Sequence, residues 1–218
     1  MDGETDRATP ALDTFFSNVR TKHIPGGQII LYEGDVPLEV YALKNGVVKM
    51  YDIDDQGNEK ILHLAKPPAL VPFAFFSGFR APLKWFYTTL TDCDFYVLPV
   101  AELKKMTRRN SDLSELLISN FFDDVHELLV RLSSMSKTNA RDKVLAALRF
   151  LMARHATARR SGWWRVDFAA SHQLIADLCG ITRESTALVM KELQTEKIVR
   201  NPRATILEIN GEKLKTLE

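Results

Sequence analysis

The segment from Ser171 to Leu193 constrains the fold of this chain more than any other part of the sequence. Apolar residues recur at helical spacing on both sides of Gly180, which predicts two short amphipathic helices joined by a tight turn. A helix pair with a glycine at the turn is typical of a helix-turn-helix, whose second helix can enter the major groove of DNA. We therefore expect this segment to bind DNA.

The second predicted helix has two distinct faces. The face expected to pack on the domain core has members at i, i+3, i+4 and i+7, which are Thr186, Val189, Met190 and Leu193. The opposite face carries the side chains expected to point at DNA, which are Arg183, Glu184, Ala187, Leu188 and Lys191. Arg183 can bond a guanine edge or a phosphate, and Glu184 can accept a hydrogen bond from a cytosine amino group.

The residues at the two helix starts fit the same role. Thr182 and Ser171 are expected to cap the second and the first helix, because a side-chain hydroxyl can satisfy a free N–H of the first turn. His172 and Gln173 follow the first cap, at the turn where we expect contacts to the DNA backbone.

The bulk composition is that of a globular chain, with 45% apolar and 26% charged residues. No apolar run is long enough to span a bilayer, and residues 1–10 lack the pattern of a secretion signal, so we expect a cytoplasmic protein without a membrane partner. Cys93 and Cys179 stand far apart, which excludes a disulfide framework or a four-thiolate cluster within one chain. Basic residues outnumber acidic ones only from Lys137 onward, so phosphates should be bound by the C-terminal segment.

Between Ile24 and Leu98 the chain consists of short apolar runs separated by turn residues. Asn45-Gly46 and the tract from Asp54 to Asn58 are good hairpin turns, because their residues tolerate positive φ. Many short strands at this spacing predict an antiparallel sandwich or barrel. The expected strands include Gln28–Tyr32, Val40–Leu43, Val47–Tyr51, Lys60–Leu64 and Phe95–Leu98.

Beyond these strands the apolar spacing changes to that of a long helix. From Leu113 to Met135, apolar residues recur in steps of three or four. A second apolar line, formed by Leu116, Phe122 and Leu129, makes the stripe wider than one contact surface needs. We expect one side to cover the β-domain and the other to pair with the same helix of a second subunit, and packing within the chain alone is the alternative.

A second domain is expected to follow this helix. The polar break Ser136–Asn139 carries a capping residue and precedes a helix from Arg141 to about His155. A basic loop at Thr157–Gly162 and a strand at Trp163–Phe168 come next. After the helix-turn-helix, two strands around a turn at Asn201-Pro202 complete a winged helix-turn-helix.

Several tracts of the chain resemble the CRP/FNR family of bacterial transcription regulators, and the resemblance covers nearly the whole sequence. Gln28–Asp35, Tyr41–Lys49 and Asp55–Lys60 look like the family's cyclic-nucleotide-binding-type β-roll. Thr182–Thr186 looks like its recognition-helix motif.

The resemblance implies an α+β fold with an N-terminal antiparallel, jelly-roll-like β-roll as sensor domain, a long dimerisation helix and a C-terminal winged helix-turn-helix. It implies a homodimer that binds double-stranded DNA and works with RNA polymerase. The expected boundaries are 1–10 for a mobile tail, 11–110 for the β-roll, 111–136 for the dimerisation helix and 137–218 for the DNA-binding domain.

Two departures from the family pattern matter. The nucleotide-binding members carry a Gly-Glu pair and an Arg-Ser pair, but the corresponding positions here are Val71-Pro72 and Leu83-Lys84, so the carboxylate and the bidentate phosphate ligand are missing. We therefore do not expect cyclic AMP as the effector. Leu188 stands where many members have a base-reading arginine, so the half-site should differ from the family's usual one.

The region of the lost phosphate pocket is rich in bulky side chains, which is consistent either with an apolar effector pocket or with a repacked core. The candidate pocket residues are Val71, Phe73, Leu83, Lys84, Trp85, Phe121 and Val125. Haem is a further alternative, with His63 or His126 as ligand, although a lone histidine is usually structural. The N-terminal cysteine group that the family's iron–sulfur members need is missing.

We therefore expect an effector-gated, dimeric transcription regulator, without a definite cofactor and without enzymatic activity. A constitutive DNA-binding regulator, whose β-roll serves only as a dimerisation scaffold, is the main alternative. An enzyme on a cupin-like barrel would need a His-x-His pair with a glutamate, and His63 has no such neighbour.

Overall fold

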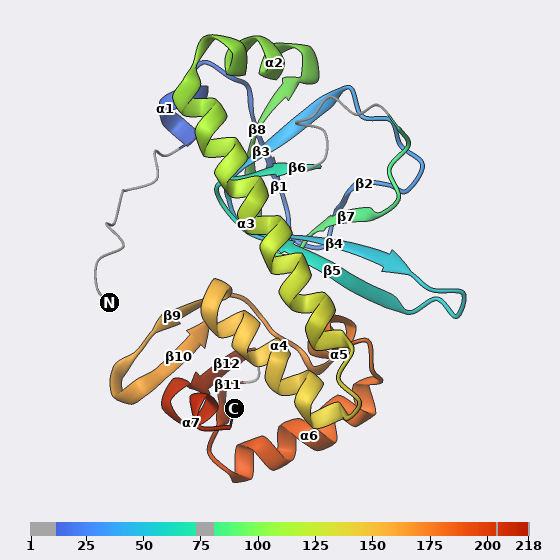
Figure 1. Cartoon of the computed structure of the whole chain (residues 1–218), viewed down its shortest axis with the longest axis vertical. Coiled ribbons are helices and arrows are strands. Elements are labelled where there is room, and N and C mark those ends of the chain that lie inside the picture. Colours follow the sequence, from blue (N-terminus) through green and yellow to red (C-terminus); the bar gives the residue numbers. More distant parts are fainter. Residues whose placement is uncertain (1–11, 73–80, 204, 218) are drawn as a thin grey trace. The chain divides into compact units, whose positions relative to one another are not determined.

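The computed structural model describes residues 12–72, 81–203 and 205–217, and Figure 1 shows its helices and strands. The chain divides into two compact units. The first contains the residues up to Asp52 together with Leu62–His126, and the second contains Ile53–Ile61 together with the residues from Glu127 onward. The expected tail at 1–10 and the pocket candidate Phe73 lie outside the described residues.

The β-roll is built from two four-stranded sheets. One has the order β1-β8-β3-β6 and contains β1 (Thr21–Ile24), β8 (Cys93–Pro99), β3 (Glu39–Asn45) and β6 (Ala69–Val71). The other has the order β2-β7-β4-β5 and contains β2 (Ile29–Leu31), β7 (Phe86–Thr89), β4 (Val48–Ile53) and β5 (Glu59–Ala65). The pairings of β1, β3 and β6 in the first sheet and of β2, β7 and β4 in the second are antiparallel. The predicted fold class is confirmed.

Strand alternation explains which side chains fill the β-roll. Leu31, Tyr87 and Met50 are paired across β2, β7 and β4, and all three are buried, so this face of the sheet packs inward. On the other sheet, Val40 and Phe95 are fully buried. Three helices belong to the N-terminal half of the chain: α1 (Leu12–Phe16), α2 (Val100–Arg109) and α3 (Ser111–Met135). The burial of Leu12 and Phe16 from α1 closes this core.

Three strands, β1, β6 and β7, are absent from the sequence prediction, because the runs are short and largely lack a clean alternation of polar and apolar residues. The three residues of β6 are all buried, so this strand shows no polar positions at all. Lys84 is exposed in a bend just before β7.

The second unit contains a four-helix, four-stranded winged domain with the sheet order β11-β12-β10-β9. Its helices are α4 (Ala140–His155), α5 (His172–Cys179), α6 (Arg183–Thr195) and α7 (Gly211–Lys215). Its strands are β9 (Ala156–Ala158), β10 (Trp163–Val166), β11 (Val199–Arg203) and β12 (Ile206–Asn210), with a short 3-10 helix at Arg160–Gly162. The core takes fully buried side chains from α4, α5 and β12, with Leu148, Ile175 and Ile209 among them. Helix α4 contacts both α5 and α6.

Two local predictions in this domain need correction. The expected basic loop at Thr157–Gly162 begins within strand β9, which pairs with β10. The expected wing turn at Asn201-Pro202 is wrong, because both residues lie inside β11, whose Arg203 pairs with Ile206 of β12. A proline is tolerated here because β11 is an edge strand.

Helix α3 is apolar on more than one side, as its sequence predicts. Leu113, Leu116 and Leu117 are buried in the core of the first unit. Further along the helix, large apolar side chains are exposed to solvent in the single chain, namely Ile118, Phe122, Leu129, Val130 and Leu132. Within the described residues, no helix is both long and apolar enough to cross a membrane.

Candidate nucleic-acid interface

The helix-turn-helix is shaped by side-chain caps and one left-handed glycine. Ser171 Oγ accepts a hydrogen bond from Leu174 N at 3.1 Å and starts α5. Gly180 ends it at φ 62°, a left-handed conformation that favours glycine. Thr182 Oγ1 then accepts from Ser185 N at 3.2 Å and starts α6. Both predicted caps are therefore present, and they fix the angle at which α6 leaves the turn.

The two faces of α6 are sorted as helical phase predicts. Thr186, Val189, Met190 and Leu193 are buried. On the other face Leu188 is 67% exposed, and Arg183, Glu184 and Lys191 are exposed as well, while Ala187 is half-buried. Helix α6 therefore presents charged, apolar and small side chains together to solvent. Side chains of these kinds can contact base edges and thymine methyl groups in the major groove.

A groove of about 500 Å³ lies beside this face. It brings together Ser171, His172 and Gln173 from the start of α5 with Arg183 from the start of α6. The other predicted contacts, Thr182, Glu184, Ala187, Leu188 and Lys191, are not among its lining residues. The groove is open to solvent.

Three lining residues, Ala170, Gln194 and Asn201, were missed by the sequence prediction. Gln194 Nε2 donates to Asn201 Oδ1 at 2.8 Å, and Asn201 Nδ2 donates to the carbonyl of Ile206 at 3.0 Å. This chain of hydrogen bonds joins the end of α6 to both strands of the wing. Gln194 follows Arg183 by eleven residues, about three helical turns, so helical phase contained the signal. Asn201 is brought in by tertiary pairing alone.

The structure also changes the expected chemistry of Gln173. Its Nε2 donates to Asp177 Oδ1 at 2.6 Å within α5, and Asp177 is buried. One N–H of the amide is thus engaged inside the protein. A contact from Gln173 to a phosphate would have to use the second N–H, which leaves the side chain less freedom than the sequence suggests.

A buried carboxylate organises the outer face of the wing. Glu208 on β12 accepts from Arg165 on β10 at 2.8 Å and from Arg200 on β11 at 2.8 Å, and the Arg200 guanidinium lies 4.0 Å from the ring centroid of Trp163. Burial by itself would raise the pKa of Glu208, but the hydrogen bonds from the two arginines outweigh it and hold the pKa below its usual value. Strands β10, β12 and β11 are thereby cross-linked by charge-assisted hydrogen bonds.

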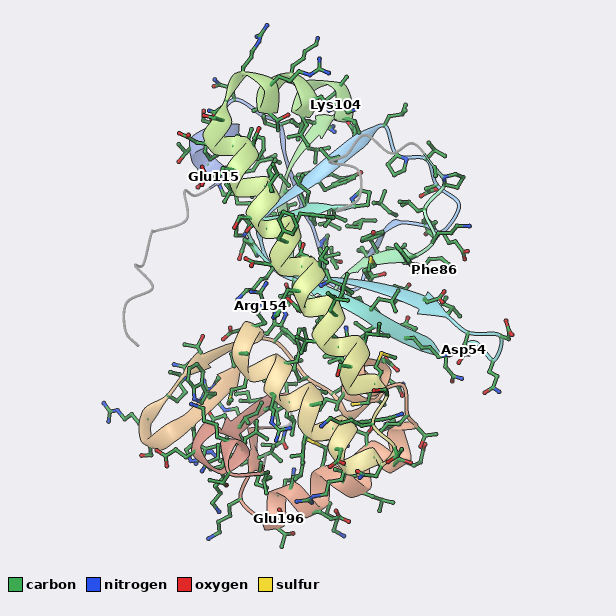
Figure 2. The ribbon with its side chains drawn as sticks, viewed as in Figure 1. Asp54, Phe86, Lys104, Glu115, Arg154 and Glu196 are labelled. Carbon is green, nitrogen blue, oxygen red and sulfur yellow. The ribbon has the colours of Figure 1, made fainter. Side chains whose placement is uncertain are left out.

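An ion pair at the far end of α6 fixes this helix to α4. Arg141 bonds Glu196 at 2.7 Å and Glu192 at 3.5 Å, and Figure 2 labels Glu196 at the end of the helix. The hydrogen bond from Arg141 lowers the pKa of Glu196. Both ends of α6 are therefore anchored, so its exposed face has a defined orientation within the winged domain.

The candidate effector residues differ in burial. Val71 and Leu83 belong to the hydrophobic core of the first unit, and Trp85 packs half-buried against it. Lys84 is exposed, while Phe121 and Val125 are half-buried on α3. The buried members favour a repacked core over an effector cavity. The list of pocket residues stays a prediction.

The two histidines considered as haem ligands differ in environment. His63 is buried, with Nε2 at 3.4 Å from Asp124 Oδ1, and His126 is exposed. A carboxylate beside a buried imidazole is an ordinary structural arrangement, so the geometry at His63 favours a structural role.

A β-roll followed by a long helix and a winged helix-turn-helix defines a DNA-binding transcription regulator that carries a domain of the nucleotide-sensing type. Residues 21–110 match the cyclic nucleotide-binding domain, and residues 143–217 match the Crp-like helix-turn-helix domain. The chain belongs to the CRP/FNR family of transcription regulators.

Known proteins with this architecture are similar over most of their length. The HTH-type transcriptional regulator ArcR of Staphylococcus haemolyticus is 26% identical over 195 residues, which cover 88% of this chain and 84% of that protein. A CRP/FNR family regulator from Thermus thermophilus has a TM-score of 0.69 at 24% identity, covering 91% of this chain and 97% of that one. The c-di-GMP responsive global regulator CLP of Xanthomonas campestris has a TM-score of 0.75 at 15% identity, covering 90% and 97%.

Proposed function

We propose that this regulator acts as a homodimer on a pseudo-palindromic DNA site and is gated by an effector other than cyclic AMP. The observation that carries the proposal is the exposed face of α6, which includes Leu188, beside the groove lined by His172 and Arg183. In a two-fold dimer, two such helices would enter successive major grooves about 34 Å apart. The protein would act where DNA and RNA polymerase are found, in the cytoplasm.

Each predicted DNA contact has a distinct chemical role in this proposal. Arg183 bonds a guanine edge or a phosphate, and Glu184 accepts from a cytosine amino group. Leu188 touches a thymine methyl group, because an aliphatic side chain has no hydrogen bond to offer a base. Lys191 and Ala187 complete the contact face, while Ser171, Thr182, His172 and Gln173 meet the phosphate backbone at the helix starts.

The exposed apolar stripe of α3 supports the dimer. Ile118, Phe122, Leu129 and Leu132 are exposed by 43%, 65%, 60% and 66%, and with half-buried Val125 they follow the alternating spacing of a coiled-coil seam. Large aliphatic side chains exposed in a row lose their contact with water when a second copy of α3 packs against them. We therefore assign this face to the subunit interface.

The choice of effector rests on which chemistry the β-roll lacks. Residues Val71-Pro72 and Leu83-Lys84 provide no carboxylate for a ribose and no guanidinium for a cyclic phosphate, and Val71 and Leu83 are buried in the core. A protein of this fold that responds to c-di-GMP has been described in Xanthomonas campestris, so the fold accommodates other effectors. The chain's own effector belongs to a different chemical class from cyclic AMP.

A constitutive regulator is the second candidate, and the packing of Val71 and Leu83 in the core favours it. A thermal-shift screen with nucleotides, haem and small aromatic compounds separates the two. Stabilisation by one ligand supports gating. Tight, specific DNA binding by the bare protein, with no ligand raising its Tm, supports the constitutive form.

Selection from a random DNA pool tests the function directly. The wild-type protein should enrich a motif of two inverted half-sites whose centres are one helical turn apart, and its mass in solution should be that of two chains. Repeating the selection with cell extract shows whether an effector changes the yield. Recovery of unenriched DNA under both conditions contradicts the proposal.

A further inference from the structure

One buried cation in the second unit has no role in the contacts described so far. Arg131 lies on the last turns of α3 and is only 7% exposed. Its Nη2 donates to the carbonyl of Ile61 at 2.5 Å and to the carbonyl of Leu178 at 3.1 Å, and its guanidinium lies 5.4 Å from the ring centroid of Phe150. A single side chain thus contacts β5, α5 and α4.

The charge of Arg131 persists in this position. Burial lowers the pKa of Arg131 to about 10, and Glu127, one turn earlier on α3, opposes that effect. The guanidinium is therefore cationic at neutral pH. Burying a cation is costly unless hydrogen bonds satisfy it, so the contacts to two backbone carbonyls and an aromatic ring define one favourable position for it.

The acceptor at Leu178 lies on the first helix of the helix-turn-helix. It belongs to the last turn of α5, where carbonyl groups lack partners within the helix and the helix dipole favours a cation. Arg131 therefore contacts the C-terminal end of α5. Ser171 caps the opposite end, where we expect the DNA contacts. A shift of this end would tilt α5 and displace its N-terminal contacts.

The acceptor at Ile61 lies on a stiff hairpin. At its tip Asp54 accepts from the backbone N–H of Gln56 at 3.0 Å and of Asn58 at 2.9 Å and pairs with Lys60 at 3.3 Å. These bonds stabilise the tip of the hairpin that runs from Ile53 to Ile61. Ile61 belongs to β5, so one hydrogen bond links this hairpin to Arg131.

We propose that Arg131 is a positioning residue for DNA recognition, which ties the β4–β5 hairpin to the C-terminal end of α5 and so sets the orientation in which the helix-turn-helix meets DNA. The inference rests on the proposed DNA-binding function. It predicts that the DNA affinity of the protein depends on a side chain that does not contact DNA. It also predicts that DNA binding changes amide exchange in the hairpin.

The test compares Arg131→Met, Arg131→Lys and a matched control, Arg154→Met, in the full-length protein. Arg154 is also an arginine of the second unit; it lies on α4, as Figure 2 shows, and it bonds α3 through Glu127 at 3.0 Å. The probes are a duplex enriched by the wild-type protein and a random duplex of equal length. Binding is measured by fluorescence anisotropy, Tm by circular dichroism and amide exchange by mass spectrometry.

Arg131→Met is expected to weaken binding to the enriched duplex by roughly tenfold while random-duplex binding changes little, and amide exchange in residues 59–61 should quicken. Arg131→Lys should recover part of the affinity, since lysine keeps the charge and can donate to carbonyl groups but lacks the planar guanidinium that lies beside the ring of Phe150. Arg154→Met should keep the wild-type ratio of specific to random binding.

Unchanged specific binding by Arg131→Met overturns the inference, whatever happens to its Tm. If that variant does not fold, amide exchange in the wild type and in Phe150→Leu provides the test. Binding of the enriched duplex must slow amide exchange in residues 59–61 of the wild type. The Phe150→Leu variant must show a smaller slowing of exchange in the same residues. Absence of both effects overturns the inference as well. If the wild-type protein itself prefers no duplex, the proposed function fails and not this inference alone.

Discussion

Glu208 shows how a single buried carboxylate can organise a small basic domain. Only 3% of the residue is exposed, and it lies between Arg165 and Arg200 on neighbouring strands. The two guanidiniums satisfy the carboxylate and are held in turn by it, so the wing sheet keeps its register without a large apolar outer face.

Glu208→Gln should destabilise the protein by about 2 kcal/mol at neutral pH, because a neutral amide makes weaker hydrogen bonds to the two arginines. Since the pKa of Glu208 is held below 4.5, the wild type should lose this contribution as the pH falls from 4.5 through the folded-state pKa. Chemical denaturation at neutral and acidic pH measures both effects. An acid loss of the same size in Glu208→Gln would contradict the assignment.

Arg183 is the residue whose loss best separates base reading from phosphate binding. Arg183→Ala should weaken binding to the enriched duplex by roughly 1–3 kcal/mol if the side chain reads a guanine. Arg20→Ala, an exposed arginine of the β-roll paired with Glu39, is the control for loss of one positive charge. An equal loss of affinity for random DNA would make Arg183 a phosphate contact instead.

At the scale of elements, the stability of α6 depends on its N-cap residue, Thr182. Thr182 accepts from Ser185 N and donates its hydroxyl proton to Ser185 Oγ at 2.9 Å. Thr182→Ala should lower stability by about 1 kcal/mol, and Thr182→Asn should restore most of it, because asparagine is also a good cap. Thermal unfolding of both variants checks this, and equal Tm values for alanine and asparagine would contradict it.

The elements that could be predicted from the sequence are those with a long and regular pattern. The helices α3 to α6 follow apolar periodicity and visible caps at Asn139, Ser171 and Thr182. The wing turn could not be placed, because Pro202 reads as a turn residue locally while the edge position of β11 tolerates it. For the same reason Asn201 could not be predicted as a site residue, since only the pairing of β11 with β12 brings it close to Gln194.

At the scale of the whole molecule, the exposed stripe of α3 decides the oligomeric state. Leu129 is 60% exposed in the single chain. Leu129→Lys should convert the dimer into monomers. A lysine at the centre of an apolar seam would have to lose its hydration, which is unfavourable. Leu188→Lys, on the equally exposed face of α6, is the matched control and should leave the mass unchanged. Light scattering after size exclusion measures both, and a dimeric Leu129→Lys protein would place the interface elsewhere.

The arrangement of β-roll, long helix and winged domain was predictable because each has its own sequence pattern and because the family resemblance extends along the chain. The effector could not be predicted, because the sequence shows which nucleotide ligands are missing but not which residues would bind another effector. Val71 and Leu83 occupy the places of a nucleotide's ligands but pack as core residues.

The central claim, that α6 reads DNA bases from its exposed face, is tested most directly by Leu188→Arg. Wild-type and variant proteins would each select duplexes from the same random pool. We predict that the variant's motif gains a guanine at one position in each half-site and keeps the wild-type preference elsewhere, because arginine bonds the major-groove edge of guanine and leucine cannot. An unchanged motif would show that this face of α6 does not contact bases.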